Sequence, residues 1–185
     1  DVQTTVRVPK SLNVLINSNG FSGGVIKEDK EFITYRYSIN QITALKREDG
    51  STDYEDFAPF LVFTQAKDYL ELGRQYYRVA MPKTRLTPEI RRLAQELTSS
   101  SMTEEEKIKV LYLWVSKNVR YISTTVDDGG LVPRDSGYIL SRRFGDCKDH
   151  VVLLEAMLRS VGIESTAALV NLGNSFELHE GPAGH

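Results

Sequence analysis

The sequence predicts an α+β protein in which an antiparallel β-rich N-terminal domain precedes a mainly helical core. Up to about residue 64, apolar and polar residues alternate between recurrent turn residues, which is typical of short strands. Farther along, apolar residues recur every three or four positions, which is typical of amphipathic helices. The only cysteine, Cys147, falls at the start of such a helix. These observations divide the chain into a β domain (1–64), connecting helices (65–100) and a core (101–185).

Composition and charge narrow the classes of function. The 185 residues are 41% hydrophobic and 26% charged, as in a globular protein, and the net charge of -2 argues against a general nucleic-acid-binding protein. A single cysteine excludes an intrachain disulfide and a cysteine-based zinc site. Asp127 and Asp128 offer too few ligands for calcium, so no metal or cofactor is predicted. No apolar run is long enough to cross a bilayer, and the start at Asp1 suggests a mature form or an excised fragment.

The β domain is predicted to contain five short strands. Alternation indicates strands over 2–8 and 12–16, and further strands are predicted over 25–26, 32–39 and 59–63, with a charged loop over 46–57. Strands this short and closely spaced predict an antiparallel meander or part of a sandwich. Tyr35 and Tyr37 share one face of their strand, where cross-strand packing is favoured over a binding surface.

Helix start and stop signals organise the next stretch. An apolar stripe from Tyr69 to Val79 predicts a helix that ends at Pro82. Later starts are predicted by Thr87 as the N-cap before Pro88, and by a capping box of Thr103 with Glu106. The rest of this region is predicted as an extended segment over 119–123, a glycine-containing loop over 124–136 and a helical turn over 138–143.

Cys147 is the candidate nucleophile. Gly145 offers a turn and Asp146 an N-cap, which places Cys147 in the first helical turn. The positive end of the helix dipole favours a thiolate there. The alternative is a small buried hydrophobe, but the charged neighbours Lys148 and Asp149 are an unusual setting for one.

The helix that follows Cys147 is predicted to be anchored in the core and to end at Gly162. The apolar face predicted to include Cys147 continues through Val151, Leu154, Leu158 and Val161, with Met157 beside them. A strand is predicted over 163–170, and the remaining residues are polar. Arg142 and Arg143 could assist a thiolate, although a solvated surface position is favoured for at least one of them.

The order of helix, extended Tyr121, glycine-rich loop and Gly145-Asp146-Cys147 resembles the transglutaminase-like superfamily, whose members share a papain-like α+β core. The strings Gly129 to Arg134 and Gly145 to Asp149 resemble one bacterial branch, in which a β-rich domain precedes the core. The Pro59 to Tyr77 stretch is similar to the junction in that branch. The resemblance implies that this chain stops before the sheet of its core is complete.

The resemblance implies a Cys-His-Asp triad in which Cys147 is the catalytic nucleophile. His185, 38 positions later, has the spacing of the family histidine but no strand after it, and no triad aspartate follows. His179 lies in the polar tail, and His150 is expected to be a surface group and not the base. The chain is either a fragment or a scaffold that has lost its triad, so little activity is expected of it alone.

The function implied is acyl transfer or amide hydrolysis on a peptide or protein substrate through a Cys147 thioester. The alternative is a catalytically incomplete scaffold or peptide-binding module. The resemblance also implies export to the periplasm or cell surface. It implies no cofactor, and the oligomeric state stays open.

Overall fold

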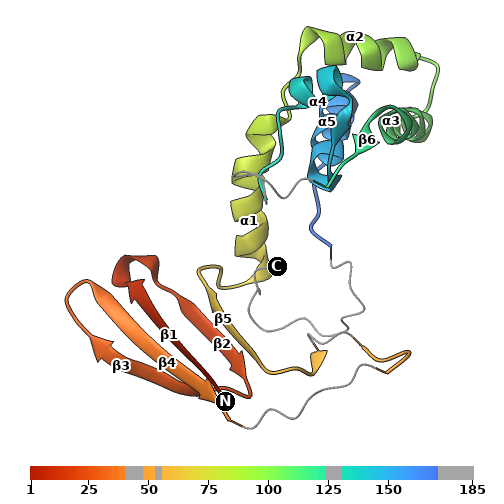
Figure 1. The fold of residues 1–185 in the computed structure, drawn as a ribbon. Helices are drawn as coiled ribbons and strands as arrows, with labels where there is room; N and C mark the ends of the chain where they lie inside the picture. Colours follow the sequence, from red (N-terminus) through yellow and green to blue (C-terminus); the bar gives the residue numbers. More distant parts are fainter. Residues whose placement is uncertain (41–47, 53–55, 124–130, 171–185) are drawn as a thin grey trace. The chain divides into compact units, whose positions relative to one another are not determined.

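A computed structural model of the chain describes residues 1–40, 48–52, 56–123 and 131–170 (Figure 1). The described residues fall into two compact units, one centred on Asp1–Leu72 and the other on Gly73–Leu169. The first is built from antiparallel strands and the second mainly from helices, so the predicted α+β fold class is confirmed. None of the described helices is long and apolar enough to span a membrane.

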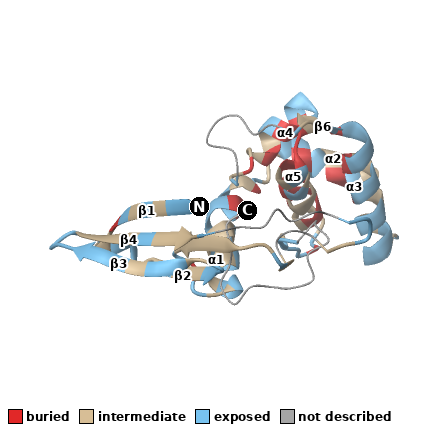
Figure 2. Ribbon diagram, turned by 60° about the horizontal axis from the view of Figure 1, so that its bottom comes forward, coloured by how far each residue is buried: buried red, intermediate tan, exposed pale blue. Residues whose placement is uncertain are grey.

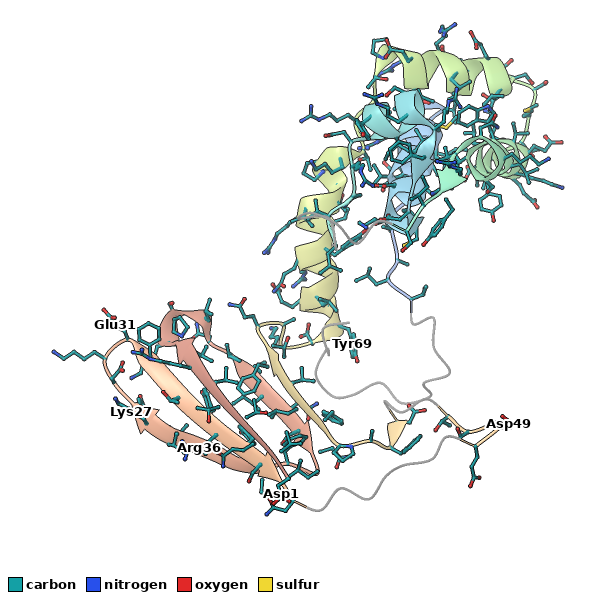
Figure 3. The ribbon with its side chains drawn as sticks, in the orientation of Figure 1. Asp1, Lys27, Glu31, Arg36, Asp49 and Tyr69 are labelled. Carbon is teal, nitrogen blue, oxygen red and sulfur yellow. The ribbon has the colours of Figure 1, made fainter. Side chains whose placement is uncertain are left out.

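The first unit contains two small antiparallel sheets. In one, β4 (Phe32–Ile39) lies between β1 (Val2–Pro9) and β3 (Ser22–Glu28). In the other, β2 (Leu15–Asn19) pairs with β5 (Phe60–Thr64). Five strands were predicted near these positions, and β4 has the predicted bounds. Charged side chains such as Lys27 and Arg36 project into solvent from the three-stranded sheet (Figure 3).

Aromatic packing joins the two sheets of this unit. The rings of Tyr35 and Tyr37, which are two positions apart on β4, meet Phe63 of β5 edge-to-face at 5.8 and 6.2 Å between centroids. This geometry is favourable for aromatic pairs. The two tyrosines therefore serve packing, as expected, although the ring they contact belongs to the other sheet and not to a neighbouring strand.

The second unit is built around a long helix, α5 (Cys147–Ser160). The chain reaches it through α1 (Tyr69–Ala80), a 3-10 turn (Met81–Lys83), α2 (Pro88–Leu97), α3 (Glu104–Asn118), β6 (Arg120–Tyr121), α4 (Ser136–Arg142) and β7 (Phe144–Gly145). The predicted caps are present: Thr87 accepts a hydrogen bond from Ile90 N, and Thr103 forms a capping box with Glu106. The buried residues gather where α2, α3, α4 and α5 meet (Figure 2).

The predicted buried face of α5 was correct in part. Leu158 and Met157 are buried, and Leu154 and Val161 pack against the core, but Val152, Leu153 and Ala156 complete the buried face and Val151 is 39% exposed. Cys147 itself is exposed. An unbroken apolar run carries little periodicity, so the packing partners decide which face is buried.

The strand predicted after α5 was wrong. The helix ends in a left-handed Gly162, as predicted, and Ile163 N donates to Leu158 O at 3.0 Å. Residues 163–170 then form no strand, because they pair with no other strand among the described residues.

The Glu106 carboxylate gives α3 an acid-sensitive start. Its hydrogen bond from Thr103 N, at 2.7 Å, holds the pKa of this carboxyl below its ordinary range. A lowered pKa in the folded state contributes stability above the ordinary value of about 4.3, and this contribution is lost as the pH falls through the folded-state pKa. We expect Glu106→Gln to keep the cap but to make the free energy of unfolding depend less on pH in the acid range. Urea unfolding between pH 7 and pH 2.5 measures this.

Glu105→Gln is the matched control, because it changes the same residue type in the same helical turn. In Glu105→Gln, the free energy of unfolding should decrease at low pH in the same way as in the wild type. If the free energy of unfolding fell equally steeply with pH below 4.5 in Glu106→Gln and in the wild type, Glu106 would not be the source of the acid sensitivity.

Candidate active site

A short parallel strand pair positions the turn before Cys147. β6 follows α3 directly and pairs with β7 in the register Arg120↔Phe144 and Tyr121↔Gly145. Arg120 N donates to Arg143 O at 2.8 Å, and Ile122 N donates to Gly145 O at 2.9 Å. The predicted extended segment after α3 therefore forms, and it fixes the backbone that enters α5.

Cys147 is the first residue of α5, and Asp146 is its N-cap, as predicted. The cap is reciprocal: Asp146 Oδ1 accepts from Asp149 N at 3.4 Å, and Asp149 Oδ2 accepts from Asp146 N at 3.2 Å. The first amides of a helix have no carbonyl partner within it. Because the capping box occupies the Asp146 and Asp149 amides, the amides of Cys147 and Lys148 are the ones left without an intrahelical acceptor.

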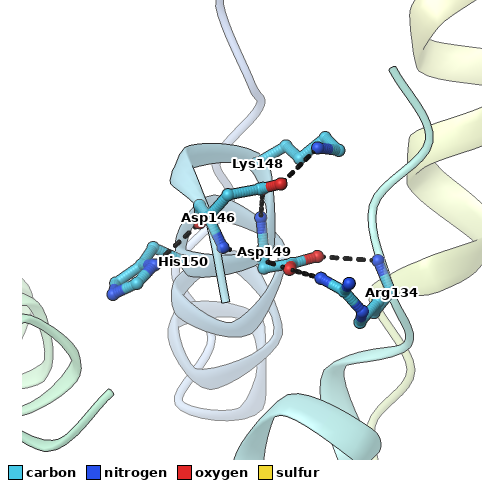
Figure 4. A network of polar contacts seen from close by, with 5 residues as sticks. All are labelled: Arg134, Asp146, Lys148, Asp149 and His150. Carbon is cyan, nitrogen blue, oxygen red and sulfur yellow. Dashed lines mark hydrogen bonds and ion pairs between the residues drawn. The ribbon is translucent and has the colours of Figure 1, made fainter. Parts of the chain in front are cut away.

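Asp149 is fully buried and ties a separate segment to this turn. Arg134 N donates to Asp149 Oδ1 at 2.8 Å, and Arg134 Nη1 lies 2.6 Å from Asp149 Oδ2 (Figure 4). The two residues are 15 positions apart in the sequence. The Asp149 carboxylate thus receives hydrogen bonds from two backbone amides and a guanidinium, which compensate for its removal from water.

Gly145 is required by this arrangement. A Cβ atom at position 145 would lie 2.5 Å from Asp149 Cβ and 2.8 Å from Asp149 Oδ2. The sequence suggested that this glycine serves a turn, but its φ is not in the left-handed region. The close approach of the Asp149 side chain is the physical reason for a glycine here.

A second ion pair completes the first turn. Lys148 Nζ lies 2.5 Å from Asp146 Oδ2, and both side chains are largely buried. Asp146 and Asp149, the two aspartates on either side of the exposed Cys147 in the sequence, therefore each have a cation as partner. The polar network can be followed in Figure 4.

His150 is not the surface group that the sequence suggested. Its ring is partly buried, with Nδ1 2.7 Å from Asp146 O and Nε2 3.0 Å from Val119 O. The ring also lies 5.9 Å from that of Tyr121. Since both ring nitrogens face backbone carbonyls, His150 connects the start of α5 to the end of α3 and does not face Cys147 as a base.

Tyr76 of α1 lies within electrostatic reach of the same turn. Burial raises the pKa of its phenol, and negative charge at Cys147 and Asp146 raises it further. Burial also raises the pKa of the Glu155 carboxyl, an effect that Arg159 partly offsets. Tyr76 therefore stays a neutral hydroxyl near the first turn of α5 at neutral pH.

The other predicted site residues are placed as follows. Arg142 lies over the Tyr138 ring at 5.7 Å, and Arg143 over the Trp114 ring at 4.4 Å, both on the exposed surface. His185 lies outside the described residues, as do His179 and the Asp127-Asp128 pair.

The sequence reading missed the role of Asp149, although a signal was present. An Asp-x-x-Asp spacing across a helix start is a form of capping box, and Asp146 and Asp149 have it. The partnership with Arg134 had no comparable local signal, because it depends on how residues 131–135 fold back onto α5.

Comparisons with known proteins agree with this fold. The sequence profile of the transglutaminase-like superfamily matches residues 91–178. The chain is also similar to the crystal structure of a candidate protease from Parabacteroides distasonis, with a TM-score of 0.72 and 20% sequence identity over 88% of this chain and 32% of that one. This chain thus spans about a third of that protein's length, and at this identity the likeness establishes the fold alone. The sequence has no match among curated proteins.

Proposed function

Residues 91–178 of this chain belong to the transglutaminase-like superfamily, and from this premise we propose that Cys147 is the nucleophile of an acyl-transfer reaction on peptide or protein amides. The observation that carries the proposal is the position of the thiol. Cys147 is exposed at the first position of a helix whose cap leaves two neighbouring amides without an intrahelical acceptor.

This position suits nucleophilic catalysis in two ways. The sulfur lies at the positive end of the α5 dipole, which stabilises negative charge there during the reaction. The amides of Cys147 and Lys148 can donate hydrogen bonds to an oxyanion that develops beside the sulfur. One short backbone segment would therefore supply both the nucleophile and the stabilising donors.

The proposed reaction has two steps. The Cys147 thiolate adds to the amide carbonyl carbon to form a tetrahedral oxyanion, which collapses to a thioester as the C–N bond breaks and the leaving amine takes a proton. Water or an acceptor amine then attacks the thioester, and the thiolate leaves. The first acceptor gives hydrolysis and the second gives transfer.

The proton transfers require a base, and we propose His185 for this role. Support comes from its spacing after Cys147 and from the family's Cys-His-Asp pattern. His150 is unsuited to the role because backbone carbonyls face both of its nitrogens. An exported location, which the family resemblance implies, is part of the same proposal.

The test is direct because Cys147 is the only cysteine in the chain. We expect the native protein, incubated with 4-nitrophenyl acetate, to gain one acetyl group at Cys147, detected by intact mass and peptide mapping. Neutral hydroxylamine should remove the group, as it does from a thioester. Cys147→Ser, which keeps the shape but not the thiolate, should gain none.

Iodoacetamide provides the complementary measurement. Because the thiol is exposed, alkylation should proceed in the folded protein at a rate that rises with pH. The proposal would be contradicted if the thiol reacted only after denaturation, or if acetylation persisted in Cys147→Ser. Either result would favour a binding or scaffold role.

A further inference from the structure

The short strand β6 holds a large aromatic side chain in an exposed position close to the candidate active site. Tyr121 is 60% exposed, and it is the register partner of Gly145, which lies two residues before Cys147. Ile122 N donates to Gly145 O at 2.9 Å, so the backbone that carries Tyr121 is tied to the backbone that enters α5. Neighbouring strands lie about 4.8 Å apart, so Tyr121 is one strand spacing from this turn.

The Tyr121 ring lies against a second ring whose orientation is fixed. The centroid of the His150 ring is 5.9 Å from that of Tyr121, at an interplanar angle of 35°. The two nitrogens of His150 lie 2.7 Å from Asp146 O and 3.0 Å from Val119 O. We call Tyr121 and His150 the aromatic shelf. Because the shelf is ordered in the free protein, a ligand that binds to it has little side-chain entropy to overcome.

His150 and Cys147 are neighbours on the surface of α5. They are three positions apart in the helix, and side chains at this spacing lie on the same face. Figure 4 shows the His150 ring projecting from α5 on the side opposite Arg134. A substrate whose reacting amide meets the exposed thiol can therefore continue along the aromatic shelf.

We propose that Tyr121 is a specificity-determining residue of this site, and that its ring, supported by His150, packs against an aromatic side chain of the substrate close to the reacting amide. This inference rests on the proposed role of Cys147 as the nucleophile. An extended peptide advances by about 3.3 Å per residue, so a side chain one or two positions from the amide can reach the shelf. Tyrosine suits this role because it offers a large contact area with few rotatable bonds.

The surroundings of the aromatic shelf favour a ring over a charged side chain as its partner. The two carboxylates in the first turn of α5 each have a cation as partner, so they leave no net negative charge to attract a cationic side chain. Arg120 precedes Tyr121 on β6, and successive side chains of a strand point to opposite faces. Ring contact is thus the main interaction that the shelf offers, and aromatic pairs attract each other beyond the area that they bury.

Two alkylating probes with the same reactive group test the proposal. Both 2-bromo-N-benzylacetamide and 2-bromo-N-methylacetamide form a C–S bond with the Cys147 thiolate as bromide leaves, and only the first carries a ring. Intact mass gives the rate constant of each probe at pH 8, and the benzyl rate is divided by the methyl rate. This ratio does not depend on how Cys147 titrates, because the same thiolate reacts with both probes. The ratio for the unfolded protein in urea gives the intrinsic preference.

We expect the benzyl-to-methyl ratio of the folded wild type to exceed that of the unfolded protein about three- to tenfold, as for one aromatic contact. Tyr121→Ala should make the two ratios equal, whereas Tyr121→Phe, which keeps the ring, should behave like the wild type. Tyr112→Ala is the matched control, because Tyr112 is 54% exposed but lies on α3. Its ratio should equal that of the wild type.

Equal ratios for the folded and the unfolded wild type would overturn the inference without the use of any variant. A preference that survives in Tyr121→Ala, or one that is lost in Tyr112→Ala, would overturn it as well. In each of these cases the methyl probe still alkylates the folded protein, so the proposed function stands. A folded protein that neither probe alkylates would refute the proposed function and this inference with it, so the two failures are distinguishable.

Discussion

Gly145→Ala should destabilise the protein by about 3 kcal/mol and distort the turn that carries Cys147. The added methyl group would lie 2.5 Å from Asp149 Cβ, well inside van der Waals contact. Asp149 cannot move away cheaply, because it is fully buried and held by Arg134 and by Asp146 N. Urea unfolding at pH 7 measures the loss, and slower iodoacetamide alkylation of the native protein would report the distortion.

Gly73→Ala is the matched control for this substitution. Gly73 lies inside α1, and a Cβ there would meet no atom within 4 Å. Alanine has the higher helix propensity, so this variant should be as stable as the wild type or up to about 1 kcal/mol more stable. If the two variants had equal stability, the contact between Gly145 and Asp149 would not be the constraint that we describe.

Leu111→Ala should cost about 2–5 kcal/mol through the cavity it leaves in the helical unit. Leu111 is fully buried in the cluster that also contains Ile90, Leu153 and Met157. Its side chain has no route to solvent and the surrounding helices can collapse only partly. Chemical denaturation should show a lower midpoint with an unchanged slope.

Leu113→Ala tests whether burial, and not helix propensity, causes that loss. Leu113 lies on the same helix but is 39% exposed. Its truncation removes the same atoms from a partly solvated position, so we expect a loss of less than half that of Leu111→Ala. Similar losses for the two leucines would mean that the buried cluster is not what stabilises α3.

Features that depend on only a few consecutive residues were predictable from the sequence. The strand over 32–39 follows from a run rich in β-branched and aromatic residues that alternates with polar ones from Ile33 onward, and the starts of α2 and α3 follow from cap residues next to apolar runs. The chain reversal at Gly162 follows from the ability of glycine to adopt a positive φ. Each of these depends on interactions within one or two turns of chain.

The buried face of α5 was not predictable in the same way. Nearly every position from Val151 to Leu158 is apolar, so many faces satisfy a helical period. Contacts with α2, α3 and α4 select the face of Val152, Leu153, Ala156, Met157 and Leu158, of which the sequence had indicated Met157 and Leu158. The strand predicted over 163–170 failed for a related reason, because alternation shows a tendency but only a paired neighbour makes a strand.

In the candidate site, too, local features were predictable from the sequence and contacts between distant segments were not. The sequence by itself placed Cys147 in the first turn of a helix capped by Asp146, because a cap, a helix start and a lone thiol are local features. Only the tertiary structure joined Arg134 to Asp149, explained Gly145 by the room that Asp149 needs, and turned His150 toward Val119. These contacts bring together segments that are far apart along the chain, and their geometry depends on how the helices pack.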